Sequence, residues 1–287
     1  PEILSRLVEA YRRIRNTIRF LLANLYDFDP AVDQVPYEKM AELDRWALHQ
    51  LALLQEKVTA AYEDYEFHTI YHAVHNFCVV TLSGFYLDVV KDRLYILKPA
   101  AAARRSTQTA LYLLADAMVR LCAPIMSFTA DEAWQHLPGE RPADNVFAVD
   151  FPALPPRFRD EALAAVWEEL LAIRRAVLKK LEAARRDKQI GLSLDARLTL
   201  QARGRVRELL ESYREQLADI FIVSQVEIGE LEAGEPGEGE EMPDLLVTVS
   251  PAAGEKCQRC WRYDRQLTPA SAAHPGICPR CLAQLED

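Results

Sequence analysis

The sequence lacks several features that define large classes of protein. Its 287 residues contain no run of the roughly 18 to 20 consecutive apolar residues that a membrane-spanning helix needs, and no signal-type apolar run at the N-terminus. No glycine-rich loop precedes a helix, since the glycines at 234, 237 and 239 lie among glutamates, which repel phosphate. No Gly-x-Ser-x-Gly sequence occurs. We therefore expect a cytoplasmic binding protein that does not contact a membrane.

Basic residues are missing from one stretch of the chain. Nine acidic residues and no Lys or Arg lie between Glu227 and Glu255, and these nine account for the formal net charge of −9. The rest of the chain has 34 acidic and 34 basic residues, so the charge does not exclude a nucleic-acid partner. The Gly- and Glu-rich segment is predicted to be a flexible loop. Arg accounts for 26 of the 34 bases and suits phosphates and bases, although a GC-rich genome gives the same bias.

Apolar spacing predicts helices over the first 137 residues. One helix is predicted before the turn at 26–36. A second helix follows this turn, a third begins near Glu66, and a fourth begins after Pro99. A short fifth helix is expected to be capped by Ser127 or Thr129. Four long helices with short connections favour an antiparallel bundle. The first helix has a stripe predicted to be buried: Leu4, Leu7, Tyr11, Ile14, Ile18, Leu21 and Leu25.

A proline-rich segment at 138–158 interrupts the helical pattern and places a boundary near residue 150. One more long helix is predicted beyond it, with Gly191 as its C-cap. Short strand-like runs then alternate with a helix, which indicates a small mixed α/β unit. The predicted strands cover 196–201, 221–228 and 244–250, and the helix between the first two covers 205–220.

Four of the six cysteines form two Cys-x-x-Cys pairs separated by seventeen residues. Two-residue gaps let one tight turn present two sulfurs, and four thiolates bind zinc tetrahedrally. Four protein ligands leave no position for water, so we predict a structural zinc ion. Cys78 and Cys122 lie in apolar helical patterns, which fits a reducing compartment. The predicted zinc ligands are Cys257, Cys260, Cys278 and Cys281.

The fold class predicted from these patterns is mainly α. We expect an antiparallel helical bundle at 1–150, a long helix plus a small mixed α/β junction domain at 151–250, and a four-cysteine zinc knuckle at 251–287. Because the chain begins at Pro1 rather than Met, we interpret it as a processed or excised piece of something larger.

Basic residues and aromatic residues occur together in three places, a mixture typical of RNA contact and base stacking. Each place has an alternative interpretation. Trp261 can pack on the metal site, the arginines of the first helix can pair with acids at 26–29 or on a neighbouring helix, and the aromatic spacing at 86–98 also fits packing. The predicted RNA-binding residues are Arg12, Arg15, Asn16 and Arg19, then Lys91 and Arg93, and finally Arg259, Trp261 and Arg262.

Several segments closely resemble the C-terminal half of bacterial isoleucyl-tRNA synthetases. The likeness lies in "EAYRRIRNTIRFLLANLYDF", "YEFHTIYHAVHNFCVVTLSGFYLDVVKDRLY", "RRSTQTALYLLADAMVRLCAPIMSFTADEAW" and "EKCQRCWRY…GICPRC", and it spans nearly the whole chain. In that family the bundle binds the anticodon, a small α/β junction follows, and the four cysteines fall where the zinc ligands fall. The signatures His-Ile-Gly-His and Lys-Met-Ser-Lys-Ser and the editing domain are absent from this chain.

The resemblance implies the tRNA-gripping part of a ligase that joins isoleucine to its tRNA using ATP. Its implied partners are isoleucine tRNA and the catalytic and editing domains of the same polypeptide, with zinc as a structural cofactor and ATP bound only in the missing catalytic domain. We expect this piece to be monomeric and inactive alone. Two other interpretations stay open: a freestanding RNA-binding protein derived from this half, and a structural zinc module that docks other protein domains.

Overall fold

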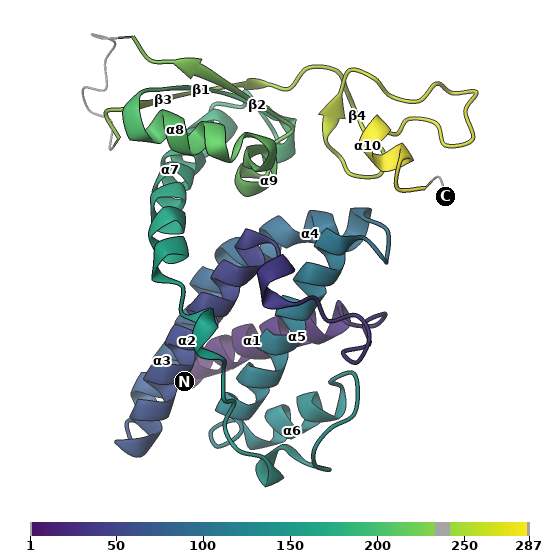
Figure 1. Ribbon diagram of the computed structural model, residues 1–287. Helices are drawn as coiled ribbons and strands as arrows, with labels where there is room; N and C mark the ends of the chain where they lie inside the picture. Colours follow the sequence, from purple (N-terminus) through teal and green to yellow (C-terminus); the bar gives the residue numbers. More distant parts are fainter. Residues whose placement is uncertain (1, 233–241, 286–287) are drawn as a thin grey trace. The chain divides into compact units, whose positions relative to one another are not determined.

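The computed structural model describes residues 2–232 and 242–285 (Figure 1). The chain divides into two compact units, Pro1–Ala164 and Ala165–Asp287. The first unit ends beyond the boundary near 150 because Val146 and Phe158 still bury their side chains in it, and Phe158 stacks on Tyr37 at 5.3 Å. The predicted acidic loop falls largely on 233–241, which lie outside the described residues.

Helices make up the first unit, which confirms the mainly α prediction. On α2, one face is buried along the whole helix, from Leu43 through Leu51 and Val58 to Ala61. The short helix α6 follows Met126 and has no side-chain cap, so the predicted caps Ser127 and Thr129 were wrong. The helices are α1 (Glu2–Ala23), α2 (Glu42–Glu63), α3 (Phe67–Asn76), the π-helix η2 (Phe77–Tyr86), α4 (Leu87–Ile96), α5 (Ala102–Cys122) and α6 (Ser127–Gln135), with 3-10 turns at Tyr37–Lys39, Val146–Ala148 and Pro156–Phe158.

The stripe on α1 is buried over only part of its length. Burial begins at Ala10 and continues through Ile14, Ile18 and Leu21. Leu4, Leu7 and Tyr11 are exposed, so the predicted burial of the first three turns was wrong. Helical spacing shows which residues share a face, but it does not show whether a neighbouring element covers that face.

The helical stretch Phe67–Ile96 has the length and mean hydropathy of a membrane span, although polar residues interrupt its apolar runs. Half of its most apolar window is buried within the protein, and a core helix passes the same test, so length and composition are weak grounds for a membrane assignment. Its residues Ile70, Leu82 and Val90 are fully buried in the bundle.

A buried carboxylate connects four helical segments of the first unit. Asp44 on α2 is completely buried and accepts hydrogen bonds from Tyr86 on η2 at 2.8 Å and from Ser106 on α5 at 2.6 Å. Thr107 also donates to it, and the guanidinium of Arg93 on α4 lies 3.4 Å away. Burial raises the pKa of Asp44, although Arg93 and the three hydroxyl donors oppose this rise.

The helix α7 (Glu161–Arg186) begins at the end of the first unit and supplies a buried face to the second. Trp167 is completely buried and meets the edge of the Tyr213 ring. Lys188 has a φ of 59°, and the amide of Gln189 bonds the carbonyl of Ala184. This left-handed C-cap lies three residues before Gly191, so the predicted cap at Gly191 was wrong.

The second unit has a three-stranded sheet in the order β2–β1–β3 (Figure 1). The central strand β1 (Ala196–Ala202) pairs in parallel with β2 (Gln225–Glu230) and antiparallel with β3 (Leu245–Pro251). Alternate side chains of β1 are fully buried, beginning at Ala196. The helices α8 (Gly204–Ser212) and α9 (Leu217–Phe221) pack on this sheet, with 3-10 turns at Ser193–Asp195 and Arg214–Gln216. The predicted alternation of strand and helix is confirmed.

Candidate metal centre and nucleic-acid interface

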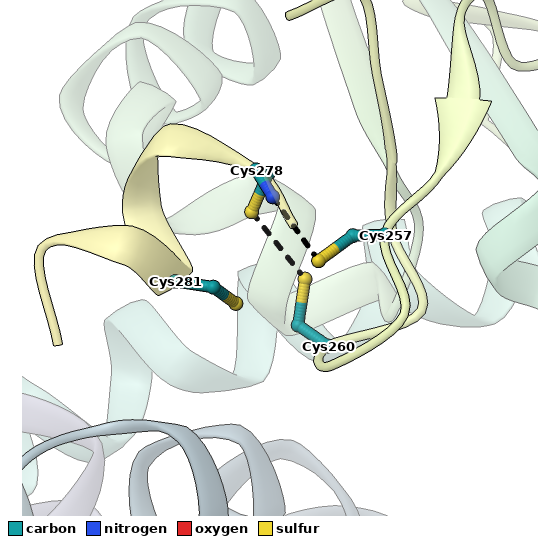
Figure 2. A group of neighbouring side chains, drawn as sticks. All are labelled: Cys257, Cys260, Cys278 and Cys281. Carbon is teal, nitrogen blue, oxygen red and sulfur yellow. Dashed lines mark hydrogen bonds between the residues drawn. The ribbon is translucent and has the colours of Figure 1, made fainter. Parts of the chain in front are cut away.

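The four predicted ligands form one cluster of thiols. Their sulfur atoms all lie within 4.8 Å of one another (Figure 2). The Sγ atoms of Cys260 and Cys278 are 3.7 Å apart. A tetrahedral zinc ion with bonds of about 2.3 Å places its sulfur ligands about 3.8 Å apart. The arrangement therefore fits a four-thiolate zinc ion that has no open coordination position.

Two small elements position the cysteine pairs. The first pair lies in the turn between β4 (Glu255–Lys256) and β5 (Tyr263–Asp264), which are paired antiparallel. Gly254 precedes this hairpin with a φ of 98°, and a Cβ there would lie 2.2 Å from the carbonyl oxygen of Asp264, so only glycine fits. The second pair lies at the start of α10 (Pro279–Leu282), which follows Cys278 directly. The amide of Cys278 also donates to the sulfur of Cys257 at 3.3 Å.

Electrostatics within the cluster favour a bound cation. Burial opposes ionisation of Cys257, but backbone N–H groups of Cys260, Cys278 and Arg259 outweigh it and lower its pKa to about 6. Burial raises the pKa of Cys278 and of Cys281, and the adjacent Cys260 sulfur adds to the rise at both. The protein groups alone therefore oppose ionisation of Cys278 and Cys281, whereas a bound divalent cation stabilises their thiolates.

Trp261 is an exposed aromatic side chain held in an unusual backbone conformation. It is 59% exposed and has a φ of 65°, which is rare for a bulky residue. Its amide donates to the carbonyl of Cys257 at 3.0 Å. The ammonium of Lys256 lies 5.9 Å from the ring centre and also 4.0 Å from Asp195. The indole is thus largely presented to solvent, which does not favour the interpretation that it packs as a miniature core on the metal.

Arg262 was predicted to contact RNA, but its guanidinium forms an ion pair with Asp219 on α9. Only 16% of its side chain is exposed, so the structure assigns it to holding the zinc module against the junction. Two further contacts join the zinc module to the junction. The amide of Tyr263 donates to Ser224 at 2.8 Å, and the side chain of Gln225 bonds both backbone groups of Ala253.

In the first unit, an exposed ridge on α1 separates two hollows. Arg12, Asn16 and Arg19 are exposed, and neither Arg12 nor Arg19 forms an ion pair with the described residues. Arg15 is half-buried and lies 3.5 Å from Glu132 on α6. One hollow of about 410 Å³ is lined by Arg15, Arg19, Thr129, Glu132 and His136, and the other, of about 250 Å³, by Arg13, Asn16, Ser83, Asp88 and Lys91.

The two cations predicted on α4 have different environments. Lys91 is exposed and lies in the smaller hollow beside Asn16, with its ammonium 2.8 Å from Asp88. Arg93 faces the buried carboxylate of Asp44, and 14% of its side chain is exposed. The structure therefore gives Arg93 a role in packing, which corrects its assignment as an RNA contact.

The segment from residue 44 to 200 matches the family model of the anticodon-binding domain of tRNA ligases, which covers more than half of the chain. The chain belongs to this anticodon-binding family. Residues 254–284 match a zinc finger found in FPG and IleRS, which includes all four clustered cysteines. The anticodon-binding match begins on α2 and ends within β1, so it spans both compact units.

Similar proteins cover the anticodon-binding chain from end to end. It is 54% identical to an isoleucine–tRNA ligase of Syntrophotalea carbinolica over 100% of its length and 50% identical to one of Geobacter sulfurreducens over 99%. An isoleucine–tRNA ligase of Carboxydothermus hydrogenoformans is 47% identical over 99%. The chain spans about a third of the length of these curated relatives.

In this member of the anticodon-binding family, the sequence patterns did not identify two residues that contact predicted site residues. Asp219 precedes its partner Arg262 by 43 residues, and no local pattern links the two. Lys256 is one residue from a zinc ligand, and its place beside Trp261 depends on the hairpin. The run before Cys257, residues 251–256, shows no alternation of apolar and polar residues, and a two-residue strand is too short to predict from such a pattern.

Proposed function

We propose that this chain is the anticodon-side, tRNA-binding part of an isoleucine–tRNA ligase. The observation that carries the proposal is the similarity of the complete chain to isoleucine–tRNA ligases, together with the anticodon-binding family match. The whole protein would join isoleucine to its tRNA using ATP. Its catalytic and editing domains would lie in the remaining two thirds of the polypeptide, and it would act as a cytoplasmic monomer.

The α1 ridge and the zinc module are the surfaces proposed to meet the tRNA. Exposed arginines are suited to contact the backbone phosphates of the tRNA, and such contacts depend little on the nucleotide sequence. Trp261 offers an exposed ring on which an unstacked base of the anticodon loop can lie, and the partly buried Arg259 is two residues away in the chain. A gel-shift titration with isoleucine tRNA and a non-cognate tRNA tests the proposal. Equal affinity for both at physiological salt would contradict it.

We expect the isolated chain to form no aminoacyl-adenylate. The sequence has no glycine-rich phosphate loop, and the signatures for ATP binding in the resembled family are absent from it. Isoleucine-dependent exchange of pyrophosphate into ATP measures this reaction directly, with the full-length ligase as the positive control. Exchange above background by the isolated chain would show that it holds a catalytic site of its own.

Replacing Arg19 with Ala should weaken isoleucine tRNA and non-cognate tRNA by about the same factor. Removing one phosphate contact should lower the slope of log affinity against log salt by about one unit. Arg157→Ala is the control, because Arg157 is an exposed arginine outside the predicted face, and its surface ion pair with Glu38 at 3.9 Å contributes little. A loss confined to the cognate tRNA would show instead that Arg19 reads a base.

A further inference from the structure

The first three turns of α1 expose a row of apolar side chains. This N-terminal apolar face consists of Leu4, Leu7, Val8 and Tyr11, which are 67, 48, 46 and 41% exposed. It continues the same stripe that becomes buried in the bundle from Ile14 onward. Single exposed apolar residues are ordinary on a protein surface, whereas four within eight residues on one helix side mark a surface that binds something.

The surroundings of this face are consistent with burial against another protein surface. The hydroxyl of Tyr11 lies 2.8 Å from that of Thr129, which brings the start of α6 beside the face. Phe128, the preceding residue, is 95% exposed and adds another apolar side chain nearby. Glu9 and Arg13 form an ion pair at 2.9 Å on the polar side of the helix, where both charges stay hydrated. The helix is thus amphipathic, with both sides in contact with water.

We infer that the N-terminal apolar face docks against another domain of the same polypeptide. The chain covers 31% of the length of its relatives, so most of such a polypeptide is available to cover the face. Interfaces between domains of one chain are small, and covalent linkage holds such surfaces together at high effective concentration. A tRNA is a poor occupant because Leu and Val side chains offer nothing to phosphates. The inference rests on the proposed membership in a longer ligase, and does not require tRNA binding.

Thiol labelling of Leu7→Cys tests the inference. The rate is measured in this chain and in the full-length polypeptide without tRNA, using mass spectrometry of the labelled peptide. Val32→Cys is the control, because Val32 is 79% exposed in the segment between α1 and α2. Cys78 and Cys122 contribute little background, since both are buried and burial raises the pKa of each thiol.

We expect labelling of Leu7→Cys to be at least tenfold slower in the full-length polypeptide, while Val32→Cys reacts equally fast in both. Val8→Cys should repeat the result for Leu7→Cys. Equal rates at Leu7→Cys would overturn the inference. Slowing that appears in the isolated chain as its concentration rises, or only after tRNA is added, would also overturn it. A tRNA titration of the same samples tests the proposed function separately, because protection can persist where tRNA binding fails.

Discussion

Replacing Cys278 with Ala should abolish stoichiometric zinc binding and unfold the zinc module while the helical bundle stays intact. Three thiolates remain, and the seventeen residues between the pairs lose their closure. Zinc binding at such sites is largely folding free energy, so the loss should be steep and local. Metal content per chain, measured after dialysis, and hydrogen exchange across α2, α5 and the zinc module should show both effects.

The same variant should bind isoleucine tRNA about tenfold more weakly, since stacking of one base on an aromatic ring contributes about 1–3 kcal/mol. Trp261 depends on the hairpin next to the metal for its exposed position. Cys78→Ala is the matched control, because it removes a thiol from the bundle and should leave metal content and tRNA affinity unchanged. Zinc retained at one ion per Cys278→Ala chain would contradict the four-thiolate site. Unchanged tRNA affinity would remove the zinc module from the proposed interface.

Replacing Asp44 with Ala should destabilise the first unit by about 3–5 kcal/mol, the cost of removing one partner from a buried ion pair. Tyr86, Ser106 and Thr107 would lose a buried acceptor, and Arg93 would be left largely buried without its carboxylate. Urea denaturation measures the loss in unfolding free energy.

The control for this variant is Asp88→Ala, because Asp88 forms an exposed pair with Lys91 at 2.8 Å. An exposed pair contributes about 0–1 kcal/mol, so its removal should cost correspondingly little. Hydrogen exchange should speed up in α2 and α5 and stay unchanged in β1, which lies in the second unit. Similar losses for Asp44→Ala and Asp88→Ala would contradict the structural role given to the buried carboxylate.

Sequence patterns predicted the helices, the strands and the zinc ligands well. They did not predict which distant residues the individual side chains contact. The four cysteines were identified correctly because zinc spacing is local and few other sites share it. Arg93 and Arg262 were assigned to RNA because a cation in sequence shows nothing of the distant carboxylate it faces, Asp44 or Asp219. Leu7 was assigned to the core for a related reason, since periodicity defines a face without defining what covers it.

The helix end at Lys188 illustrates a different limit. Gly191 was the natural choice for a left-handed cap, because glycine adopts that conformation at the lowest cost. The bond from Gln189 to the carbonyl of Ala184 closes the helix earlier and holds Lys188 in the left-handed region. The division of the chain into three functional domains at 150 and 250 stays a prediction.

The contacts of Ala253, Arg262 and Tyr263 with the junction all come from residues that flank the first cysteine pair in the chain. They hold the hairpin that carries Cys257 and Cys260, whereas Cys278 and Cys281 lie on the later segment with α10. Assembly of the zinc site should therefore have an order. The junction would keep the first cysteine pair ready to capture the ion, and the second pair would close over it, so that metal release begins at the C-terminal pair and leaves half of the site in place for recapture.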